Sequence, residues 1–549
     1  MRVHLNSEMK LRASLENKRF DVLVIGGGIN GVAIARECAR AGRRTLLVEQ
    51  HDFAAGTTSR STRIIHGGLR YLEHGDIGQV RESLRERRWL LQRYPHLVHP
   101  FKFLLALDGN SRRSALAVRV GLWLYQTMGS ASVRTHNSRA EEKKLEQLLD
   151  SGRRFSVFNF DDAQCEFPER LVAEWLVEGI AAGATARNHT QVLTVDIRNG
   201  RATGALLRDQ LSGKEERVEA NWIINATGPW ADNICHSSNI RTDSPMVGGV
   251  RGSHLVLPKF TGAPDAAVYT EAVDGRPIFV IPWNEQVLVG TTEVADGGDP
   301  GQVRPSPDEI DYLLRSLRRL FPNVPASRDD IHYAFAGVRP LPYSPKNSPS
   351  DVTRKHYFHD HAGEGAAQMI SVIGGKLTTA GSLARECAVK IGAGISASTL
   401  AVASETNSDV AMEQWVLDVA KRGGLGAESA HGIAEWYGKR ALAVAGLARG
   451  RAEMRAQLCP HTRHIVAEAA HAFNNECACT LADVLLRRVP VALGGCWSSS
   501  CSREAATQIG AAMAWSETRV ALELEAFERE RESFLQKGSH AGTVLEAKA

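Results

Sequence analysis

The sequence predicts an α/β protein, α+β overall, built from three parts. A glycine-rich turn between two short apolar runs predicts a Rossmann-like dinucleotide-binding domain. Short apolar strands separated by turns, between about residues 248 and 342, predict an antiparallel β-sheet domain. Helical, polar sequence after about residue 401 predicts a helical C-terminal domain. A chain of 549 residues is too long for one ordinary core, so two or three domains are expected.

The glycine-rich turn comes first. The run Asp21–Ile25, apolar from Val22 onward, leads into it, and a helical pattern over 32–40 follows. A second apolar run, residues 45–48, ends at Glu49, which is placed to accept hydrogen bonds from a ribose. The glycines permit, in order, a tight bend, the approach of a pyrophosphate and close helix–strand packing: Gly26, Gly28 and Gly31. This unit predicts a dinucleotide site with its phosphates at a helix N-terminus.

The order of elements indicates how the domains are divided. Strand–glycine turns recur near residues 25, 226 and 374, with strand-rich sequence between them. One nucleotide-binding domain assembled from distant segments explains this order, and it is typical of FAD enzymes of the glutathione-reductase or amino-acid-oxidase type. It therefore favours FAD over NAD. The expected parts are a discontinuous FAD-binding domain over 20–75, 185–240 and 350–400, an inserted substrate or cap domain over 76–184 and 241–349, and a helical domain over 401–540.

Individual elements follow from local patterns. Helices are expected over 76–94 and 171–183, and a β-hairpin over 191–211 that turns at Asn199-Gly200. Further strands are expected at 221–230, 254–257, 277–281, 287–292 and 369–379, the last running into a helix.

Bulk properties exclude several classes of protein. A formal net charge of +4 is too small to indicate nucleic-acid binding by itself. Residues 1–19 contain no apolar stretch of the kind that secretory signals have, and no uncharged apolar run is long enough to span a membrane. The nine cysteines indicate reduced thiols. No metal site is expected, because the C-terminal cysteines have irregular spacing and Cys477 and Cys479 fall in a helical pattern that turns them to different sides.

Six motifs occur in order: IHGGLRYLE at 65–73, ATGPW at 226–230, GSH at 252–254, GTT at 290–292, GVRP at 337–340 and GGKLTT at 374–379. Together they resemble FAD-dependent glycerol-3-phosphate dehydrogenase, the aerobic, quinone-linked family. Residues 480–488 are similar to that family's C-terminal domain. Arg63, where lysine is expected, and Glu293, where aspartate is commoner, depart from the pattern.

The resemblance implies oxidation of sn-glycerol 3-phosphate to dihydroxyacetone phosphate, with FAD as cofactor and ubiquinone or another membrane quinone as acceptor. A glycerol-3-phosphate oxidase that uses O₂, and an enzyme related to amino-acid oxidases, are the alternatives. It further implies a cytoplasmic protein that lies peripherally on the anionic inner face of a bacterial plasma membrane. A homodimer is possible, and no nucleic-acid partner is expected.

The resemblance also implies site residues. It places six at the substrate: Arg70, Tyr71, His254, Thr291, Arg339 and Lys376. Three of them, His254, Arg339 and Arg70, are taken as catalytic. An imidazole suits a base at neutral pH, so His254 is the candidate base and His66 its rival. Guanidinium groups suit a phosphate dianion because they stay charged and bind two oxygens at once.

The cofactor is expected to contact the glycine turn, a hydroxyl-rich loop and the later motifs. The residues concerned are Gly26, Gly27, Gly28, Asn30, Gly31, Glu49, Thr57, Thr58, Ser59, Ser61, His66, Gly67, Gly68, Ala226, Thr227, Gly228, Gly374, Gly375, Lys376, Leu377 and Thr378.

A membrane-facing segment is expected over residues 98–128, which mix basic and apolar side chains; the alternative is a core helix whose arginines pair elsewhere. Three arginines would meet anionic headgroups and three apolar side chains would enter the acyl boundary. They are Arg112, Arg113 and Arg119, and Leu122, Trp123 and Leu124.

Overall fold

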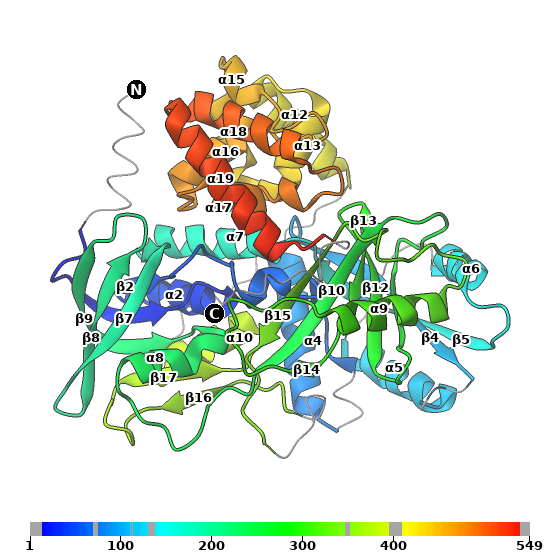
Figure 1. Cartoon of the computed structure of the whole chain (residues 1–549), viewed down its shortest axis with the longest axis horizontal. Coiled ribbons are helices and arrows are strands. Elements are labelled where there is room, and N and C mark those ends of the chain that lie inside the picture. The colour runs from blue at the N-terminus through cyan, green and yellow to red at the C-terminus, as the bar shows by residue number, and fades with distance from the viewer. Residues whose placement is uncertain are drawn as a thin grey trace, which may run out of the picture.

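Two β-sheets lie side by side, and a helical domain covers them from one side (Figure 1). This fold comes from a computed structural model. The structure describes residues 14–69, 75–109, 111, 113–129, 138–345, 352–394 and 409–537. The mixed α/β architecture, with its Rossmann-like unit, antiparallel sheet and helical C-terminal domain, confirms the fold class predicted from the sequence.

The first sheet contains the Rossmann-like unit. Its order is β16-β17-β9-β1-β2-β6, with β8 paired to β9 and β7 to β8. Its strands are β1 (Arg19–Ile25), β2 (Thr45–Val48), β6 (Thr185–Arg187), β7 (Thr190–Arg198), β8 (Arg201–Asp209), β9 (Glu215–Asn225), β16 (Tyr357–Asp360) and β17 (Met369–Ile373). β1 is parallel to β2 and β9, with Val24 opposite Leu47 and Ile224. A near-continuous apolar run suits β1, because helices and neighbouring strands bury it.

Helices on the first sheet bring together distant parts of the chain. They are α2 (Ile29–Arg40), α7 (Pro168–Ala181), α8 (Ala231–Ser237) and α10 (Ala380–Lys390), while α4 (Ile77–Arg93) lies between α10 and the strands β4 and β5 of the second sheet. The expected helices 76–94 and 171–183 correspond to α4 and α7. α7 packs closely on α2. The distance shows this, since a Cβ at Gly179 would lie only 3.4 Å from the Arg36 Cα. The expected hairpin is also confirmed: β7 and β8 turn at Asn199 and Gly200, both with positive φ.

The second sheet is antiparallel except where β11 meets β4. Its order is β14-β10-β13-β12-β11-β4-β5-β3, and β15 pairs with β10. The strands are β3 (Ile64–Ile65), β4 (Val98–Asp108), β5 (Phe155–Cys165), β10 (Val250–Pro258), β11 (Ala267–Glu271), β12 (Pro277–Trp283), β13 (Gln286–Gly290), β14 (Val294–Ala295) and β15 (Tyr333–Arg339). The helices α5 (Ala115–Gly129), α6 (Ser138–Leu148) and α9 (Pro307–Leu320) accompany it. The domain limits proposed from the sequence remain a prediction.

The segment 98–128 is not one membrane-facing unit. β4 lies inside the second sheet and its side chains are mostly buried. In α5, Leu122 is buried in the core instead of facing outward. Arg113 forms an ion pair with Glu271 at 2.8 Å, and Arg112 lies outside the described residues. Of the helices in the described ranges, none is long and apolar enough to cross a membrane.

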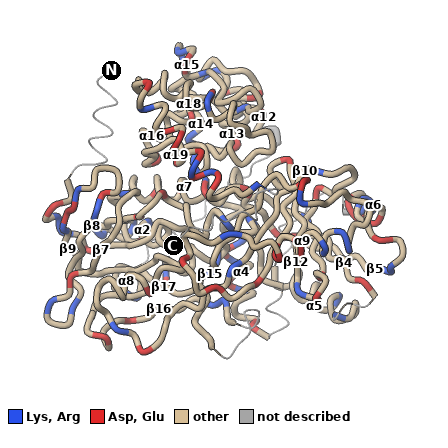
Figure 2. The backbone as a smooth tube through the Cα atoms, viewed as in Figure 1, with Lys and Arg blue, Asp and Glu red and all other residues tan. Residues whose placement is uncertain are grey.

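The C-terminal domain is helical, as predicted. It comprises α12 (Asp409–Gly423), α13 (Ala427–Tyr437), α14 (Ala441–Ala448), α15 (Ala452–Arg455), α16 (Val466–Asn475), α17 (Leu481–Asp483), α18 (Ser499–Met513) and α19 (Glu517–Phe534). Charged residues of both signs meet below α19, where this domain joins the first sheet (Figure 2). There Arg488 pairs with Asp52 at 2.7 Å, with both side chains buried.

The placement of two cysteines differs from expectation. Cys477 and Cys479 lie in the loop between α16 and α17, not within a helix. Cys477 has a φ of 58°, which ends the helical backbone there. An apolar, alanine-rich run before this loop produced the wrong helical expectation.

Candidate functional site

A large cavity of about 1340 Å³ opens beside the glycine-rich turn. β1, β2 and β9 end at this cavity, and α2 begins there. The edge where parallel strands end is the usual ligand site in an open α/β sheet. Fourteen of the residues expected at the cofactor line this cavity: Gly26, Gly28, Asn30, Glu49, Thr57, Thr58, Ser61, Ala226, Thr227, Gly228, Gly374, Gly375, Lys376 and Leu377.

The turn requires glycine for two different reasons. Gly26 has a φ of 105°, and a Cβ there would lie 2.6 Å from the Ala226 carbonyl oxygen. A Cβ on Gly31 would lie 1.9 Å from the Gly26 carbonyl oxygen, so the helix cannot approach the strand with any side chain there. At Gly28 a Cβ would meet only the Thr58 hydroxyl, at 3.4 Å, and would otherwise project into the cavity. The space beside Gly28 is therefore left open for a ligand.

Glu49 ends β2 and fixes the turn. Its carboxylate accepts hydrogen bonds from the Gly27 N–H at 2.6 Å and the His51 N–H at 2.9 Å. Burial raises the pKa of Glu49 above its usual value, against the effect of these two hydrogen bonds. Glu49 also lines the cavity, so it occupies the position that the fingerprint assigns to the ribose acceptor.

The hydroxyl-rich loop forms a 3₁₀ turn over Thr57–Arg60. Thr58 accepts a hydrogen bond from the Ile29 N–H at 3.1 Å, which anchors the loop to the start of α2. Ser59 is turned away: its hydroxyl donates to the Ala54 carbonyl, and it lines neither cavity. Gly27, Gly31, Gly67 and Gly68 likewise support the backbone without lining a cavity.

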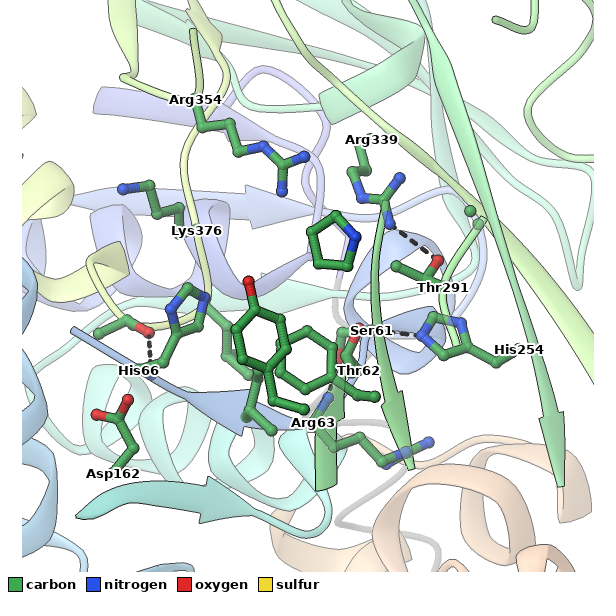
Figure 3. Close-up of a pocket in the computed structure, with 18 of the residues that line it drawn as sticks. Ser61, Thr62, Arg63, His66, Asp162, His254, Thr291, Arg339, Arg354 and Lys376 are labelled. Carbon is green, nitrogen blue, oxygen red and sulfur yellow. Dashed lines mark hydrogen bonds between the residues drawn. The ribbon is translucent and has the colours of Figure 1, made fainter. Parts of the chain in front are cut away.

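A second, smaller cavity of about 270 Å³ adjoins the first. It lies where β10, β12 and β15 of the second sheet face the loop after the glycine turn (Figure 3). Five residues line both cavities: Thr57, Arg60, Ser61, Lys376 and Leu377. Tyr269 and Phe279 line the smaller cavity and stack with ring centroids 4.8 Å apart. We refer to this cavity as the substrate pocket.

Cations outnumber anions around the substrate pocket. Among the described residues, its lining includes six cationic side chains: Arg60, Arg63, Arg276, Arg339, Arg354 and Lys376. Two carboxylates, Asp162 and Glu293, also line it. Since Asp162 forms a buried ion pair with Arg87, the pocket is electropositive and suits a multiply charged anion.

Arg339 and Arg354 point into the same part of the pocket (Figure 3). Arg339, at the end of β15, donates to the Thr291 hydroxyl at 2.9 Å, which brings together two residues expected at the substrate. Arg354 forms an ion pair with Glu293. Sequence reasoning missed Arg354, since no motif surrounds it and only its basic character marked it.

His254 is buried on β10 and faces the pocket. Its Nε2 lies 3.0 Å from the Thr62 hydroxyl, and its ring stacks on Phe335 with centroids 5.1 Å apart. Its Nδ1 has no hydrogen-bond partner among the described residues. Burial, together with the charges of Arg339 and Arg63, lowers the pKa of His254 to about 3, so the imidazole is neutral.

His66 lines the opposite side of the pocket, near Lys376 (Figure 3). Burial and the Lys376 charge lower its pKa to about 3 as well. The His66 backbone N–H donates to the Thr378 hydroxyl at 3.2 Å, which links two motifs far apart in the sequence. Lys376 donates to Gln79 Oε1 at 2.8 Å, and burial lowers its pKa to about 8.

Two expected substrate residues, Arg70 and Tyr71, lie outside the described residues. Arg63, which departs from the expected lysine, is paired with Glu169 at 3.0 Å and lies over the Trp283 ring. Both Arg63 and Glu169 are buried. Arg63 therefore joins the loop to α7 and the second sheet.

Comparisons with known proteins agree with this geometry. The family described as FAD dependent oxidoreductase matches residues 21–380. The C-terminal domain of alpha-glycerophosphate oxidase matches residues 391–520. A Synechocystis protein named glycerol-3-phosphate dehydrogenase is 36% identical over 498 residues, which cover 87% of this chain and 90% of that protein.

Two further relatives have related names. A Pseudomonas aeruginosa glycerol-3-phosphate dehydrogenase is 35% identical over 68% of this chain and 71% of its own length. A Brucella abortus D-erythritol 1-phosphate dehydrogenase is 37% identical over 67% of this chain and 73% of its own length. The structure of a Bacillus halodurans glycerol-3-phosphate dehydrogenase complexed with FAD shares the fold, with a TM-score of 0.74 and 23% identity over 96% of this chain and 97% of that one.

These matches make the protein an FAD-dependent oxidoreductase. The observed residues fit FAD, because Gly28 leaves room for a pyrophosphate and Glu49 lines the cavity at the ribose position.

Proposed function

Because this chain belongs to the family of FAD-dependent glycerol-3-phosphate dehydrogenases, we propose that it oxidises sn-glycerol 3-phosphate to dihydroxyacetone phosphate. The observation that carries this proposal is the electropositive substrate pocket, which adjoins the dinucleotide cavity and contains Arg339, Arg354 and Lys376. Bound FAD supplies the hydride acceptor for the substrate C2 hydrogen.

Arg339 binds the substrate phosphate in this proposal. Its guanidinium is oriented by Thr291 at 2.9 Å and stays charged at all physiological pH values. Arg354 adds a second guanidinium, which Glu293 holds in place. A phosphate dianion between two fixed guanidiniums gains charge-assisted hydrogen bonds that neutral glycerol cannot make. This accounts for selection of a phosphorylated substrate.

His254 takes the hydroxyl proton in this proposal. Its Nε2, which lies 3.0 Å from the Thr62 hydroxyl, accepts this proton, because the Nδ1 is buried away from the pocket. The low pKa of His254 reflects burial and the neighbouring charge of Arg339. A bound phosphate dianion offsets that charge, so it raises the basicity of His254 when the substrate is present.

Steady-state kinetics test this assignment. The purified FAD-loaded protein is assayed with an artificial acceptor on sn-glycerol 3-phosphate, glycerol and a panel of amino acids. We expect turnover on the phosphate ester and poor turnover on glycerol. Turnover on an amino acid with none on glycerol 3-phosphate would favour the amino-acid-oxidase alternative, which needs cations for only one carboxylate.

A second candidate substrate is a longer polyol phosphate. The Brucella abortus relative is named for D-erythritol 1-phosphate, and the same phosphate cradle and base would serve either compound. Comparing kcat/KM for glycerol 3-phosphate and D-erythritol 1-phosphate distinguishes them. We expect the three-carbon substrate to be preferred, in keeping with the Synechocystis relative that covers most of the chain.

We propose a membrane quinone as the electron acceptor. The names of the relatives described above support a dehydrogenase, whereas the name of the C-terminal family refers to an oxidase. With glycerol 3-phosphate as donor, we expect a ubiquinone analogue to be reduced faster than O₂ is converted to H₂O₂. The reverse order would assign the protein to the oxidases.

We further propose that α5 attaches the protein to an anionic membrane surface. Four apolar side chains share one face of α5 at helical spacing and are exposed: Leu116 (72%), Val120 (56%), Trp123 (65%) and Leu124 (37%). Arg119 lies beside them, and Tyr125 on the opposite face is buried in the core. An exposed apolar stripe flanked by a basic residue is the pattern of a helix that lies in the interface of a bilayer.

Co-sedimentation with anionic liposomes tests this surface. The variant Leu116→Glu/Trp123→Glu should sediment less than the wild type, because two apolar anchors become charged. Leu522→Glu on α19, where the leucine is also exposed (61%), is the matched control and should sediment like the wild type. Equal sedimentation of all three proteins would contradict attachment through α5.

A further inference from the structure

Three potential metal ligands meet in the C-terminal domain, away from both cavities. The Sγ atoms of Cys459 and Cys501 and a ring nitrogen of His461 all lie within 4.8 Å of one another. The His461 Nδ1 is 3.7 Å from the Cys501 Sγ. The irregular spacing of the C-terminal cysteines argued against a metal site, because the three ligands come from two segments about 40 residues apart that only the fold brings together.

Local structure fixes both segments. Cys459 and His461 lie in a turn closed by a hydrogen bond from the Leu458 N–H to the His464 carbonyl at 3.0 Å. Cys501 lies in the first turn of α18, where its N–H donates to the N-cap hydroxyl of Ser498. Both thiols are buried, whereas His461 is exposed. The ligand atoms are therefore held by ordered backbone and remain reachable from solvent through the imidazole.

The electrostatic environment of Cys501 favours a thiolate. The positive end of the α18 dipole lies at this position and stabilises negative charge. The Cys501 Sγ lies 3.4 Å from the Ser498 hydroxyl and 3.7 Å from the His461 Nδ1. Two thiols and an imidazole thus face one another, and a divalent cation would displace the thiol protons on binding.

We propose that Cys459, His461 and Cys501 bind a zinc-type divalent cation, with Cys496 as the fourth ligand. Zinc bonds of about 2.3 Å to sulfur and about 2.1 Å to nitrogen place tetrahedral ligand atoms roughly 3.5–3.8 Å apart. The 3.7 Å between His461 Nδ1 and Cys501 Sγ matches that separation. Cys496 is exposed, and its carbonyl oxygen lies 3.7 Å from the Cys501 Sγ, so its backbone lies beside the group. Four protein ligands make the site structural.

The composition of the group favours a metal over a disulfide. A disulfide between Cys459 and Cys501 would use two ligands and leave the convergence of His461 without a role. Two other groups among the described residues have similar spacing. In one, the carboxylates of Asp52 and Asp483 already pair with Arg487 and Arg488. The other, His359, His361 and Glu364, contains no thiol, whereas the thiol-containing group offers the soft ligands that zinc accepts.

Metal analysis of the full-length FAD-loaded protein, purified without chelators, tests the proposal. We expect about one zinc per chain by inductively coupled plasma mass spectrometry. His461→Ala, which changes an exposed side chain, and Cys501→Ser should both lose the metal. Cys479→Ser is the matched control: Cys479 donates to Asn188 Oδ1, a serine can do the same, and zinc content should stay at the wild-type value.

Two results would overturn the proposal. One is a wild-type protein that holds no zinc after incubation with Zn²⁺ and dialysis, and the other is equal zinc content in wild type and His461→Ala. Absence of metal together with two fewer titratable thiols than the nine in the sequence would instead assign a disulfide. Cobalt substitution provides a second readout, since tetrahedral thiolate ligation gives ligand-field bands beyond the flavin absorption. Cys496→Ser should weaken these bands, and unchanged bands would remove Cys496 from the ligand set.

Discussion

The dinucleotide cavity and the substrate pocket adjoin each other but are built in different ways. Around the dinucleotide cavity, the turn that carries Gly26, Gly28 and Gly31 is shaped by backbone and by the absence of side chains. The substrate pocket is shaped by charged and aromatic side chains. They come from the hydroxyl-rich loop, from β10, β12 and β15, and from Arg354 and Lys376. Backbone recognition needs a short contiguous motif, whereas side-chain recognition needs distant segments to converge.

The difference has a consequence for mutations. A change in the glycine turn alters the space for the cofactor or the packing of α2, so it acts on cofactor content or on folding. A change in the substrate pocket alters charge or proton transfer, and it should leave FAD in place. The predictions below use this separation, from the largest expected effect to the smallest.

Gly28→Val should abolish FAD binding while the protein still folds. Gly28 has φ −71° and ψ 178°, an extended backbone that valine adopts, and its Cβ would project into the cavity. Gly31→Val should instead prevent folding, because its Cβ would lie 1.9 Å from the Gly26 carbonyl oxygen. Flavin absorbance and circular dichroism of the two variants distinguish these outcomes. A yellow, FAD-loaded Gly28→Val protein would contradict the placement of the pyrophosphate.

His254→Asn should lower kcat by roughly 100- to 10,000-fold, the usual contribution of a general base. FAD content should not change, since His254 does not line the dinucleotide cavity. His66→Asn is the matched comparison, because His66 also lines the substrate pocket and is half-buried and neutral. A larger loss of kcat in His66→Asn than in His254→Asn would exchange the two roles.

Arg339→Ala should lower kcat/KM for glycerol 3-phosphate roughly 30- to 150-fold, which corresponds to an activation free energy higher by about 2–3 kcal/mol. The loss arises from a charge-assisted hydrogen bond to phosphate, so the slow turnover of glycerol should hardly change. Arg354→Ala should also raise KM, since it removes a cation and leaves the Glu293 charge in the pocket. Wild-type kinetics in both variants would place the phosphate elsewhere.

The pH dependence of kcat/KM should show the titration of Lys376. Because burial lowers its pKa to about 8, Lys376 is charged below that pH and loses its attraction for phosphate above it. We expect kcat/KM to fall as pH rises through about 8. Lys376→Arg stays charged and should remove this fall. A profile that is flat to pH 9 in the wild type would show that Lys376 does not contribute to binding.

The sequence predicted the backbone-built region more completely than the pocket. A single βαβ pattern contained Gly26, Gly28, Gly31 and Glu49, and strand and helix periodicity located their elements. Arg354 escaped prediction because its importance depends on Glu293 and Arg339, which are distant in sequence. Ser59 lay in the expected loop, but the direction of its hydroxyl is set by Ala54. Periodicity locates an element and leaves unspecified which distant partner a side chain meets.

The same limit explains the errors outside the pocket. Leu122 was expected on a membrane face because it neighbours Trp123 and Leu124 in the sequence. In α5, however, Leu122 faces the core while Trp123 is exposed. Which face of an amphipathic helix is buried depends on the element it packs against, and here this is β5 and α4.

An anaerobic titration of the FAD-loaded protein with sn-glycerol 3-phosphate tests the central claim most directly. In the wild type, glycerol 3-phosphate should bleach the visible absorption of the flavin stoichiometrically. In Arg339→Ala, the same substrate concentration should bleach it far more slowly. Glycerol should bleach neither protein at comparable concentrations. A wild-type flavin that stays oxidised with glycerol 3-phosphate but is bleached by an amino acid or by an unphosphorylated alcohol would contradict the account.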